Sequence, residues 1–268
     1  MAMNVGIAGL GTIGMPVARA LAAGIPGLDL VGVASGRRER AEARLREAGI
    51  SVPVVSIADL VARAEVIVEC APGAVFRAIA EAALGAGRVL VTVSGAALMD
   101  APEFVDLAKR TGGRIVLVTG ALLGLDAVRA AAEGNLHSVR IISRKPPRSL
   151  RGAPYLVERN IDVEKVERAT KLFDGSARDG ARGFPANLNV AAALSLAGLG
   201  PDRTRLEIWA DPAVSRNTHT IEVDADSARF TMTIENVPSA ENPATGQITP
   251  LSVIATLRGL VAPLRVVT

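Results

Sequence analysis

Short apolar runs alternate with longer helix-like stretches through the first half of the chain. The apolar runs are rich in β-branched residues, and they lie at 5–8, 30–34, 52–57, 66–70, 88–93 and 114–119. The helix-like stretches lie at 15–23, 38–48, 74–84 and 101–110. Continuous apolar strands that alternate with helices are typical of a parallel sheet buried on both faces. Residues 1–120 are therefore predicted to form an α/β domain with a doubly wound parallel sheet.

The pattern changes around residues 120–124, where strands and helices become mixed. Strands are expected at 138–143, 204–210, 218–223 and 228–235, helices at 125–133, 163–173 and 187–197, and a loop rich in proline and arginine at 144–154. This mixture predicts a second, α+β domain over 121–245. The last helix, at 250–259, is apolar on most sides and is expected to be buried, so that the segment 246–268 joins the first domain.

A glycine-rich turn, GLGTIG, connects the first expected strand to the first helix. Gly9 allows a tight turn, Gly11 lets the backbone approach a pyrophosphate, and Gly14 lets the helix pack closely on the strand. The free N–H groups and the dipole at the helix N-terminus favour the negative charge of a diphosphate. The first domain is therefore predicted to be a Rossmann-type dinucleotide-binding domain, with Thr12 and Ile13 also contacting the cofactor.

The end of the second strand bears on the choice between NAD and NADP. An acidic residue that would bind the adenosine ribose is expected roughly 20 positions after the glycines, but Ser35, Arg37 and Arg38 lie there instead. Guanidinium groups pair well with a 2′-phosphate, which favours NADP over NAD. Alternatively, these arginines are only the solvated first turn of a helix.

Two further loops follow strands of the predicted sheet, and ligands gather at the carboxyl ends of such strands. We expect their backbones to line the cofactor site at Cys70, Ala71, Ser94 and Gly95. Cys70 is the single cysteine, and its place at the end of an apolar run favours a packing role over that of a nucleophile.

Composition limits the remaining possibilities. The chain has 268 residues, of which 49% are hydrophobic and 21% charged, enough for one or two globular domains. No apolar stretch reaches the length of a membrane span, and the immediate start of a strand leaves no room for a signal peptide, so a cytoplasmic protein is expected. A net charge of +3 with 3% aromatic residues gives no indication of nucleic-acid binding. No metal site is predicted.

Histidine is the side chain whose ordinary pKa suits proton transfer near neutral pH, and the chain has two. His137 lies in an expected helix-to-strand connection, where a surface or capping role is favoured. His219 ends the polar segment 215–219 just as a strand begins, with donors and a cation beside it. It is the better candidate for a catalytic residue, although a structural histidine has the same sequence signature.

Several motifs together resemble those of the L-aspartate dehydrogenase family. They occur in the family's order along nearly the whole chain, as GALLGLD at 120–126, SRKPP at 143–147, FPANLNVAA at 184–192, RNTH at 216–219, ENVP at 235–238 and ENP at 241–243. The resemblance implies a Rossmann domain joined to an α+β domain, a homodimer, and oxidative deamination of L-aspartate to iminoaspartate, then oxaloacetate and ammonia. The iminoaspartate can supply NAD biosynthesis.

By that resemblance, His219 is the catalytic base, and it must face a nicotinamide ring held by the N-terminal half. Ala121 and Asn187 match positions that contact the cofactor. An asparagine at 187 suits the nicotinamide carboxamide, although it could also be a helix N-cap. Asn189, two positions further along the helix, is a weaker candidate on the substrate side.

A small dicarboxylic amino acid needs cationic partners, and the nearest by motif are Arg144, Lys145 and Arg216. Arg144 and Lys145 could instead be a solvated loop pair.

Two alternatives use the same architecture. One is another dehydrogenase, acting on a sugar or on homoserine, although sugar enzymes of this build usually carry Glu-Lys-Pro where this chain has Ser94-Gly95-Ala96. The other is a cofactor-binding regulator without turnover, which the presence of both His219 and Asn187 disfavours.

Overall fold

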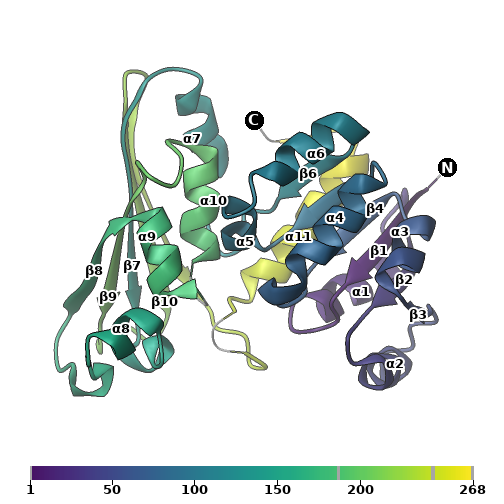
Figure 1. Cartoon of the computed structure of the whole chain (residues 1–268), viewed down its shortest axis with the longest axis horizontal. Coiled ribbons are helices and arrows are strands. Elements are labelled where there is room, and N and C mark those ends of the chain that lie inside the picture. The colour runs from purple at the N-terminus through teal and green to yellow at the C-terminus, as the bar shows by residue number, and fades with distance from the viewer. Residues whose placement is uncertain (1, 186–187, 243–244, 267–268) are drawn as a thin grey trace. The chain divides into compact units, whose positions relative to one another are not determined.

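The computed structural model describes residues 2–185, 188–242 and 245–266. The chain divides into two compact units (Figure 1). Unit 1 contains the first 118 residues together with Thr249–Arg265, and unit 2 contains Thr119–Ile248. Among the described residues, no helix has both the length and the apolar character that a bilayer crossing requires.

Unit 1 is built on a six-stranded parallel sheet with the strand order β3-β2-β1-β4-β5-β6. In chain order the strands are β1 (Met3–Ala8), β2 (Leu28–Ala34), β3 (Val54–Val55), β4 (Val66–Glu69), β5 (Val89–Thr92) and β6 (Arg114–Leu117). Because β1 pairs with both β2 and β4, the strand order reverses at β1. This order confirms the predicted doubly wound sheet, and the crevice at the reversal is where such folds bind dinucleotides.

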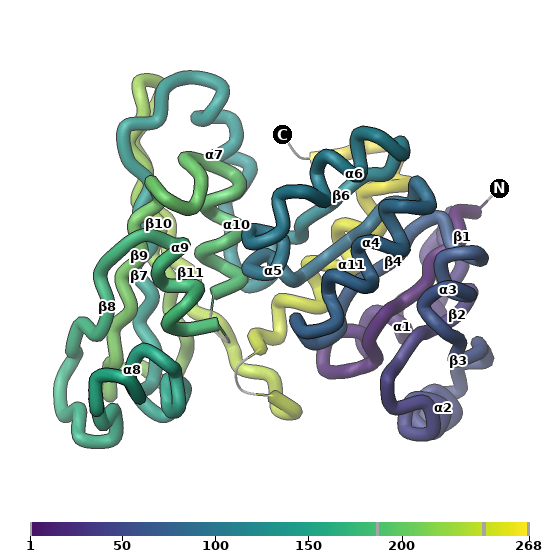
Figure 2. The backbone as a smooth tube through the Cα atoms, in the orientation of Figure 1, coloured from purple at the N-terminus to yellow at the C-terminus, as the bar shows by residue number. Residues whose placement is uncertain are grey.

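Helices cover both faces of this sheet. One apolar core includes α1 (Gly14–Ala22) and α2 (Arg38–Glu47), and the other includes α3 (Ile57–Arg63), α4 (Phe76–Gly85) and α6 (Glu103–Thr111). The terminal helix α11 (Ile248–Val261) supplies Val253 and Leu257 to the first core. Figure 2 shows α11, in yellow, among the purple and blue elements of unit 1.

Two expectations for unit 1 are wrong in detail. The strand expected at 52–57 is only two residues long, and α3 begins at Ile57 because the Ser56 hydroxyl accepts a hydrogen bond from the amide of Asp59. A serine cap followed three positions later by an acidic residue starts a helix. The loop expected at 94–96 likewise turns directly into the short helix α5 (Gly95–Met99).

Unit 2 contains a five-stranded mixed sheet with the order β11-β10-β7-β9-β8. In chain order its strands are β7 (Leu136–Lys145), β8 (Thr170–Ser176), β9 (Arg205–Ala210), β10 (Asn217–Ala225) and β11 (Arg229–Asn236). All neighbours are antiparallel except β7 and β9. The helices of unit 2 are α7 (Leu125–Ala132), α8 (Pro154–Glu158), α9 (Ala177–Gly183) and α10 (Asn189–Ala197).

The helix expected at 163–173 is wrong. A single 3-10 turn covers Val163–Lys165, and β8 follows from Thr170 because Leu172 and Phe173 are buried while the strand pairs with β9. The loop expected at 144–154 also starts too early, since β7 continues through Lys145. Tertiary pairing overrides local propensity in both places.

Candidate active site

The glycine turn of unit 1 has the backbone geometry of a phosphate cradle. Gly9 has φ +100°, and a Cβ atom there would lie 2.6 Å from the carbonyl oxygen of Cys70. A Cβ on Gly14 would lie 1.9 Å from the carbonyl oxygen of Gly9, whereas one on Gly11 would meet nothing within 4 Å. The outer glycines are therefore required by the fold, and the middle one leaves room for a ligand.

The N-terminus of α1 behind this turn has no internal counter-charge. Ile13 is the N-cap residue of α1, and its side chain makes no capping hydrogen bond. The first turn of α1, all of which the structure describes, contains no acidic residue. Arg44 of α2 donates to the carbonyl oxygen of Leu10 at 3.1 Å and so fixes the turn from outside. The residues present fit a bound diphosphate.

Of the two arginines that follow β2, Arg37 is better placed than Arg38 to bind a phosphate. The Ser35 hydroxyl accepts a hydrogen bond from the backbone amide of Arg37, which lies exposed at the N-cap of α2. Arg38 is already paired with Glu42 through a 2.8 Å contact one helical turn along. Arg37 is therefore the better candidate for a phosphate ligand. The ion pair of Arg38 with Glu42 favours its interpretation as part of a solvated helix turn.

A buried carboxylate joins the loops that follow β4 and β5. Glu69 accepts a hydrogen bond from the amide of Ala71 at 2.9 Å and from the hydroxyl of Thr92 at 2.6 Å. Burial raises the pKa of Glu69, and hydrogen bonds from Thr92, Ser94 and Ala71 oppose that rise. The carboxylate therefore holds these two loops together beside the glycine turn.

Cys70 follows Glu69 directly and packs against the core of unit 1. Its own burial, and then the charge of Glu69, raise the pKa of the Cys70 thiol well above 9. A thiol with a raised pKa is a poor nucleophile, which agrees with a packing role.

Unit 2 places three polar side chains on the buried face of its sheet. His219 on β10 pairs directly with Ser143 on β7, and its Nδ1 lies 2.9 Å from the Ser143 Oγ. Lys145 lies two residues further along β7 and so points to the same face. All three residues are 3% exposed. The predicted candidates His219 and Lys145 are thus brought together, and Ser143 joins them.

Burial controls the protonation of this cluster. Burial, and to a smaller extent the charge of Lys145, together lower the pKa of His219 to about 3. Burial also lowers the pKa of Lys145 to about 8. At neutral pH the imidazole is therefore neutral while the ammonium retains most of its charge.

Arg144 points to the opposite face of the sheet, because side chains alternate along β7. Its guanidinium stacks 4.8 Å from the ring centroid of Trp209 and pairs with Asp211 at 3.2 Å. The structure therefore separates Arg144 from His219, although the two residues are close in register.

The other predicted residues of unit 2 are dispersed. Arg216 is exposed, Asn189 is exposed at the start of α10, and the carbonyl oxygen of Ala121 accepts a hydrogen bond from Asn236 at 2.9 Å. Asn187 lies outside the described residues. His137 lies within β7 rather than in a connection, and it pairs with Asp226 at the surface.

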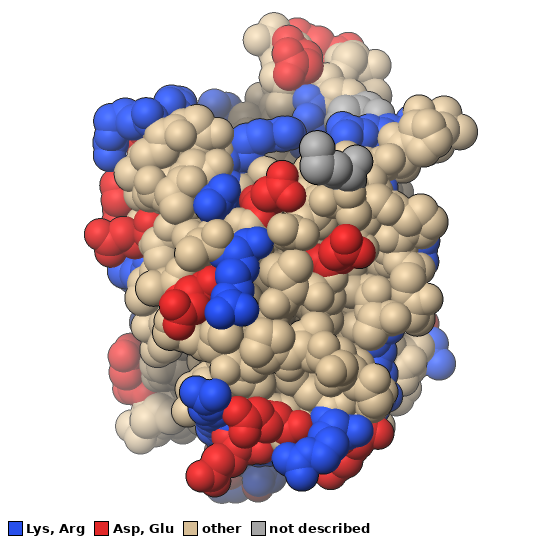
Figure 3. All heavy atoms as spheres, turned by 90° about the vertical axis from the view of Figure 1, so that its right-hand side faces the viewer, with Lys and Arg blue, Asp and Glu red and all other residues tan. Residues whose placement is uncertain are grey.

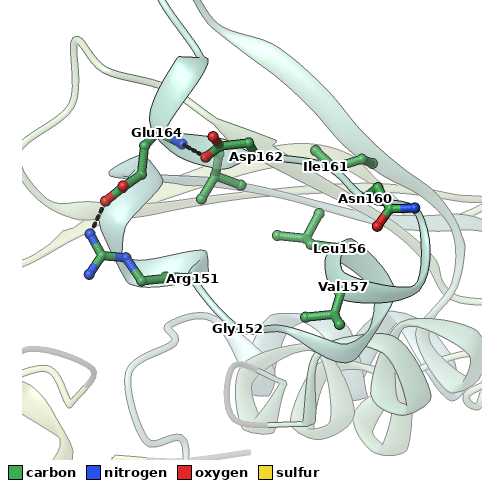
Figure 4. Close-up of a pocket in the computed structure, with 9 residues that line it drawn as sticks. Arg151, Gly152, Leu156, Val157, Asn160, Ile161, Asp162 and Glu164 are labelled. Atoms are coloured by element: carbon green, nitrogen blue, oxygen red, sulfur yellow. Dashed lines mark hydrogen bonds and ion pairs between the residues drawn. The ribbon is translucent and has the colours of Figure 1, made fainter.

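A separate hollow in unit 2, of about 370 Å³, contains none of the predicted site residues. It is lined by α8 and the 3-10 turn after it, and its Arg151 is paired with Glu164 (Figure 4).

On the face drawn in Figure 3, basic and acidic side chains are interspersed rather than gathered into a patch of one sign.

The sequence assigned no role to the side chains of Ser143 and Glu69, although the backbone of the loop that begins at Glu69 was expected to line the cofactor site. The signal for Glu69 was available, since a carboxylate that ends an apolar run must find hydrogen bonds inside the protein. Ser143 could be assigned only from its pairing with His219, which a single strand does not reveal.

The chain matches two family models that together cover most of its length. Residues 9–118 match the NAD binding domain of homoserine dehydrogenase, and residues 126–260 match the C-terminal domain of aspartate dehydrogenase. These matches, together with the doubly wound sheet and its glycine turn, indicate an oxidoreductase that uses a nicotinamide dinucleotide.

The whole-chain relatives narrow this class. The chain is 54% identical to the L-aspartate dehydrogenase of Bradyrhizobium diazoefficiens, over 96% of this chain and 91% of that protein. It is 51% identical to L-aspartate dehydrogenase 3 of Bordetella bronchiseptica, over 98% and 97% of the two chains. The chain belongs to the L-aspartate dehydrogenase family, which confirms the resemblance seen in its motifs.

Solved structures agree on the fold. The crystal structure of aspartate dehydrogenase from Thermotoga maritima superposes with a TM-score of 0.74 at 23% identity, covering 99% of both chains. Scyllo-inositol dehydrogenase from Lactobacillus casei, solved with NAD(H) and scyllo-inositol, gives a TM-score of 0.54 at 16% identity, over 97% of this chain and 88% of that one.

Proposed function

We propose that the protein catalyses the NAD(P)-dependent oxidative deamination of L-aspartate to iminoaspartate, which water converts to oxaloacetate and ammonia, or the reverse reductive amination. One observation of the structure carries this proposal, namely the buried group of His219, Ser143 and Lys145 on one face of the sheet. It combines a proton acceptor with a cation for a substrate carboxylate, in a chain of the aspartate dehydrogenase family.

His219 is the proposed base, with Ser143 as its positioning partner. If the imidazole donates its Nδ1 proton to the Ser143 hydroxyl oxygen, the lone pair on Nε2 is free to accept a proton from the substrate amine. That proton must leave before the α-carbon can lose a hydride. The same imidazole can then assist the attack of water on the imine.

Lys145 is the proposed partner of a substrate carboxylate. Its positive charge lowers the pKa of His219, so a carboxylate bound beside it offsets that charge and makes the imidazole more basic. Substrate binding would thereby activate the base. Arg216 and Asn189 remain candidates for the second carboxylate or the amine, and Arg144 is a weaker one because it lies on the opposite face.

For the cofactor we propose NADP in preference to NAD. A bound nicotinamide supplies the acceptor for the hydride. The turn from Gly9 to Gly14, with Thr12 and Ile13, would hold the diphosphate, and Ser35 and Arg37 would hold the 2′-phosphate. Positions further along the chain that would line the nicotinamide half are Cys70, Ala71, Ser94, Gly95, Ala121 and Asn187.

We further propose that the protein is a homodimer that supplies iminoaspartate to NAD biosynthesis. The face of the unit 2 sheet opposite His219 carries Trp209, which is partly exposed, and a nearly buried Glu207 that accepts a hydrogen bond from the Trp209 indole. A second copy of the chain would cover this face. Light scattering on the purified protein tests the dimer directly.

A panel of amino acids with both cofactors tests the activity. We expect L-aspartate to reduce NADP well and NAD more weakly, whereas L-glutamate and sugars give no turnover. His219→Ala should lower kcat by about two to four orders of magnitude while NADPH binding persists. The matched control is His137→Ala, which removes an exposed imidazole of the same unit. Full activity in His219→Ala would refute the assigned base.

Cofactor preference is tested by Arg37→Ala, with Arg40→Ala as a control at an exposed arginine in the first turn of α2. We expect only Arg37→Ala to shift the preference toward NAD, by roughly tenfold or more in kcat/KM. An equal effect of both variants would indicate general surface charge rather than a 2′-phosphate contact.

A further inference from the structure

We propose that the Glu69 carboxylate makes the cofactor site prefer the oxidised, cationic nicotinamide over the reduced, neutral one. The inference rests on the proposed use of a nicotinamide cofactor, but it does not depend on the substrate or on His219. It assigns a role to a buried acidic group that the proposed reaction leaves unused.

Glu69 is the last residue of β4 and is 0% exposed. Its Oε1 accepts from the amide of Ala71, and its Oε2 accepts from the hydroxyl of Thr92, which in turn accepts from the amide of Ser94. The carboxylate therefore has donors from the loop after β4 and from the end of β5. Burial raises the pKa of this carboxyl group, and the donors directed at both oxygens oppose that rise because they favour the ionised form.

The charge of this carboxylate is not balanced by a cation. Within the described residues, the groups that act on its pKa are its own burial and the hydrogen bonds from Thr92, Ser94 and Ala71, and none of these is positively charged. A buried charge without a counter-ion is costly, and hydrogen bonds offset only part of that cost. A positive charge that binds nearby is therefore attracted to this position.

The fold places Glu69 on the nicotinamide side of the sheet. In a doubly wound sheet the dinucleotide lies across the carboxyl ends of the strands, with its pyrophosphate on the turn after β1 and its adenosine toward β2. The other half of the cofactor then extends toward β4 and β5. Glu69 ends β4 in register with Ala8 of β1 and Thr92 of β5. The next peptide, Cys70 to Ala71, lies against Gly9 of the turn.

The two redox forms of the cofactor differ in charge at the ring. The oxidised nicotinamide carries a positive charge that the reduced ring lacks, while the phosphates and the adenosine are the same in both. A negative charge buried at the carboxyl end of β4, on the side toward which the nicotinamide half extends, therefore acts selectively on the oxidised form. A preference on the order of tenfold corresponds to about 1.4 kcal/mol, which is less than two unit charges several ångströms apart gain at an effective dielectric constant of about 20.

The test is to measure the dissociation constants of NADP⁺ by calorimetry and of NADPH by fluorescence, without substrate. For Glu69→Gln we expect the affinity for NADP⁺ to fall on the order of tenfold relative to that for NADPH. Glu69→Met offers a second neutral side chain of the same length, in case the glutamine variant does not fold. Glu69→Asp keeps the charge and should keep most of the preference.

Thr92→Ser serves as the matched control at this contact, because it keeps a hydroxyl that can donate to the carboxylate and so leaves the charge of Glu69 in place. We expect it to keep the wild-type preference between NADP⁺ and NADPH. If the neutral Glu69 variants weaken the binding of NADP⁺ and of NADPH equally, Glu69 only positions the loops and the inference is overturned. Failure of the wild-type protein to bind either form would overturn the proposed cofactor as well.

Discussion

Replacement of Lys145 by methionine distinguishes two effects of this side chain. One is the folding stability that is lost by burying its charge, and the other is its contribution to substrate binding. Lys145 is 3% exposed, and its burial lowers its pKa from 10.5 to about 8. Methionine has a similar length and no charge, so it fills the same space without the unfavourable energy of burying an ammonium group. We therefore expect Lys145→Met to be more stable than the wild type and much less able to bind aspartate.

The magnitude follows from the pKa difference. The drop from 10.5 to about 8 in the folded protein, at about 1.4 kcal/mol per unit, corresponds to about 3 kcal/mol of stability lost by burying the ammonium. We expect the gain in the methionine variant at neutral pH to be of this order. The KM for L-aspartate should rise by about 10- to 100-fold, the usual range for losing a charged partner of a carboxylate.

The gain in stability of Lys145→Met over the wild type should decrease as the pH rises. The pKa of Lys145 is lower in the folded protein than in the unfolded chain, so the unfolded chain binds more protons between about pH 8 and pH 10.5. The stability lost by burying the ammonium is therefore fully present below pH 8 and disappears above pH 10.5. The advantage of the methionine variant must shrink as the pH rises through this window.

Urea unfolding of the wild type and the variant, at about pH 7 and about pH 10, measures this difference. Lys165→Met is the control, because its ammonium side chain in the same unit is 84% exposed. We expect the control to change stability little at either pH. The reasoning is refuted if Lys145→Met is less stable than the wild type, or if its gain is the same at both pH values.

Three further predictions concern the Ser143–His219 hydrogen bond, the glycine turn of unit 1 and the burial of His219. Ser143→Ala should lower kcat more than it raises KM and shift the pH profile of kcat, because it removes the Nδ1 partner of His219, and Ser143→Thr should restore much of the activity. Gly14→Ala should destabilise unit 1 in thermal unfolding because its Cβ meets the Gly9 carbonyl oxygen, whereas Gly11→Ala should leave the melting temperature unchanged and weaken NADPH binding in fluorescence titrations. Acid should destabilise the wild type as the pH falls from 6.5 toward 3, since the unfolded chain then protonates His219 while the fold keeps it neutral, and urea titrations of His219→Gln should show a shallower decline.

Local pattern was sufficient for the architecture of unit 1. Runs of β-branched residues, amphipathic helices and a glycine turn are properties of adjacent residues, so the sequence predicted the doubly wound sheet and the position of the glycine turn between β1 and α1. Family motifs also pointed to His219 and Lys145. The short β3 and the early start of α3 were missed because a cap at Ser56 outweighed the apolar run around it.

Contacts between distant residues decided the rest. Register between β7 and β10 puts Ser143 and Lys145 on the face of His219 and sends Arg144 to the other, a distinction that depends on strand pairing and is invisible in the motif SRKPP. The segment at 163–173 pairs as a strand because β9 offers it an edge. Burial, which lowers the pKa of His219 and raises that of Glu69, exists only after the chain has folded. Sequence thus determined which chemical groups are available, and tertiary structure determined their neighbours and their charge.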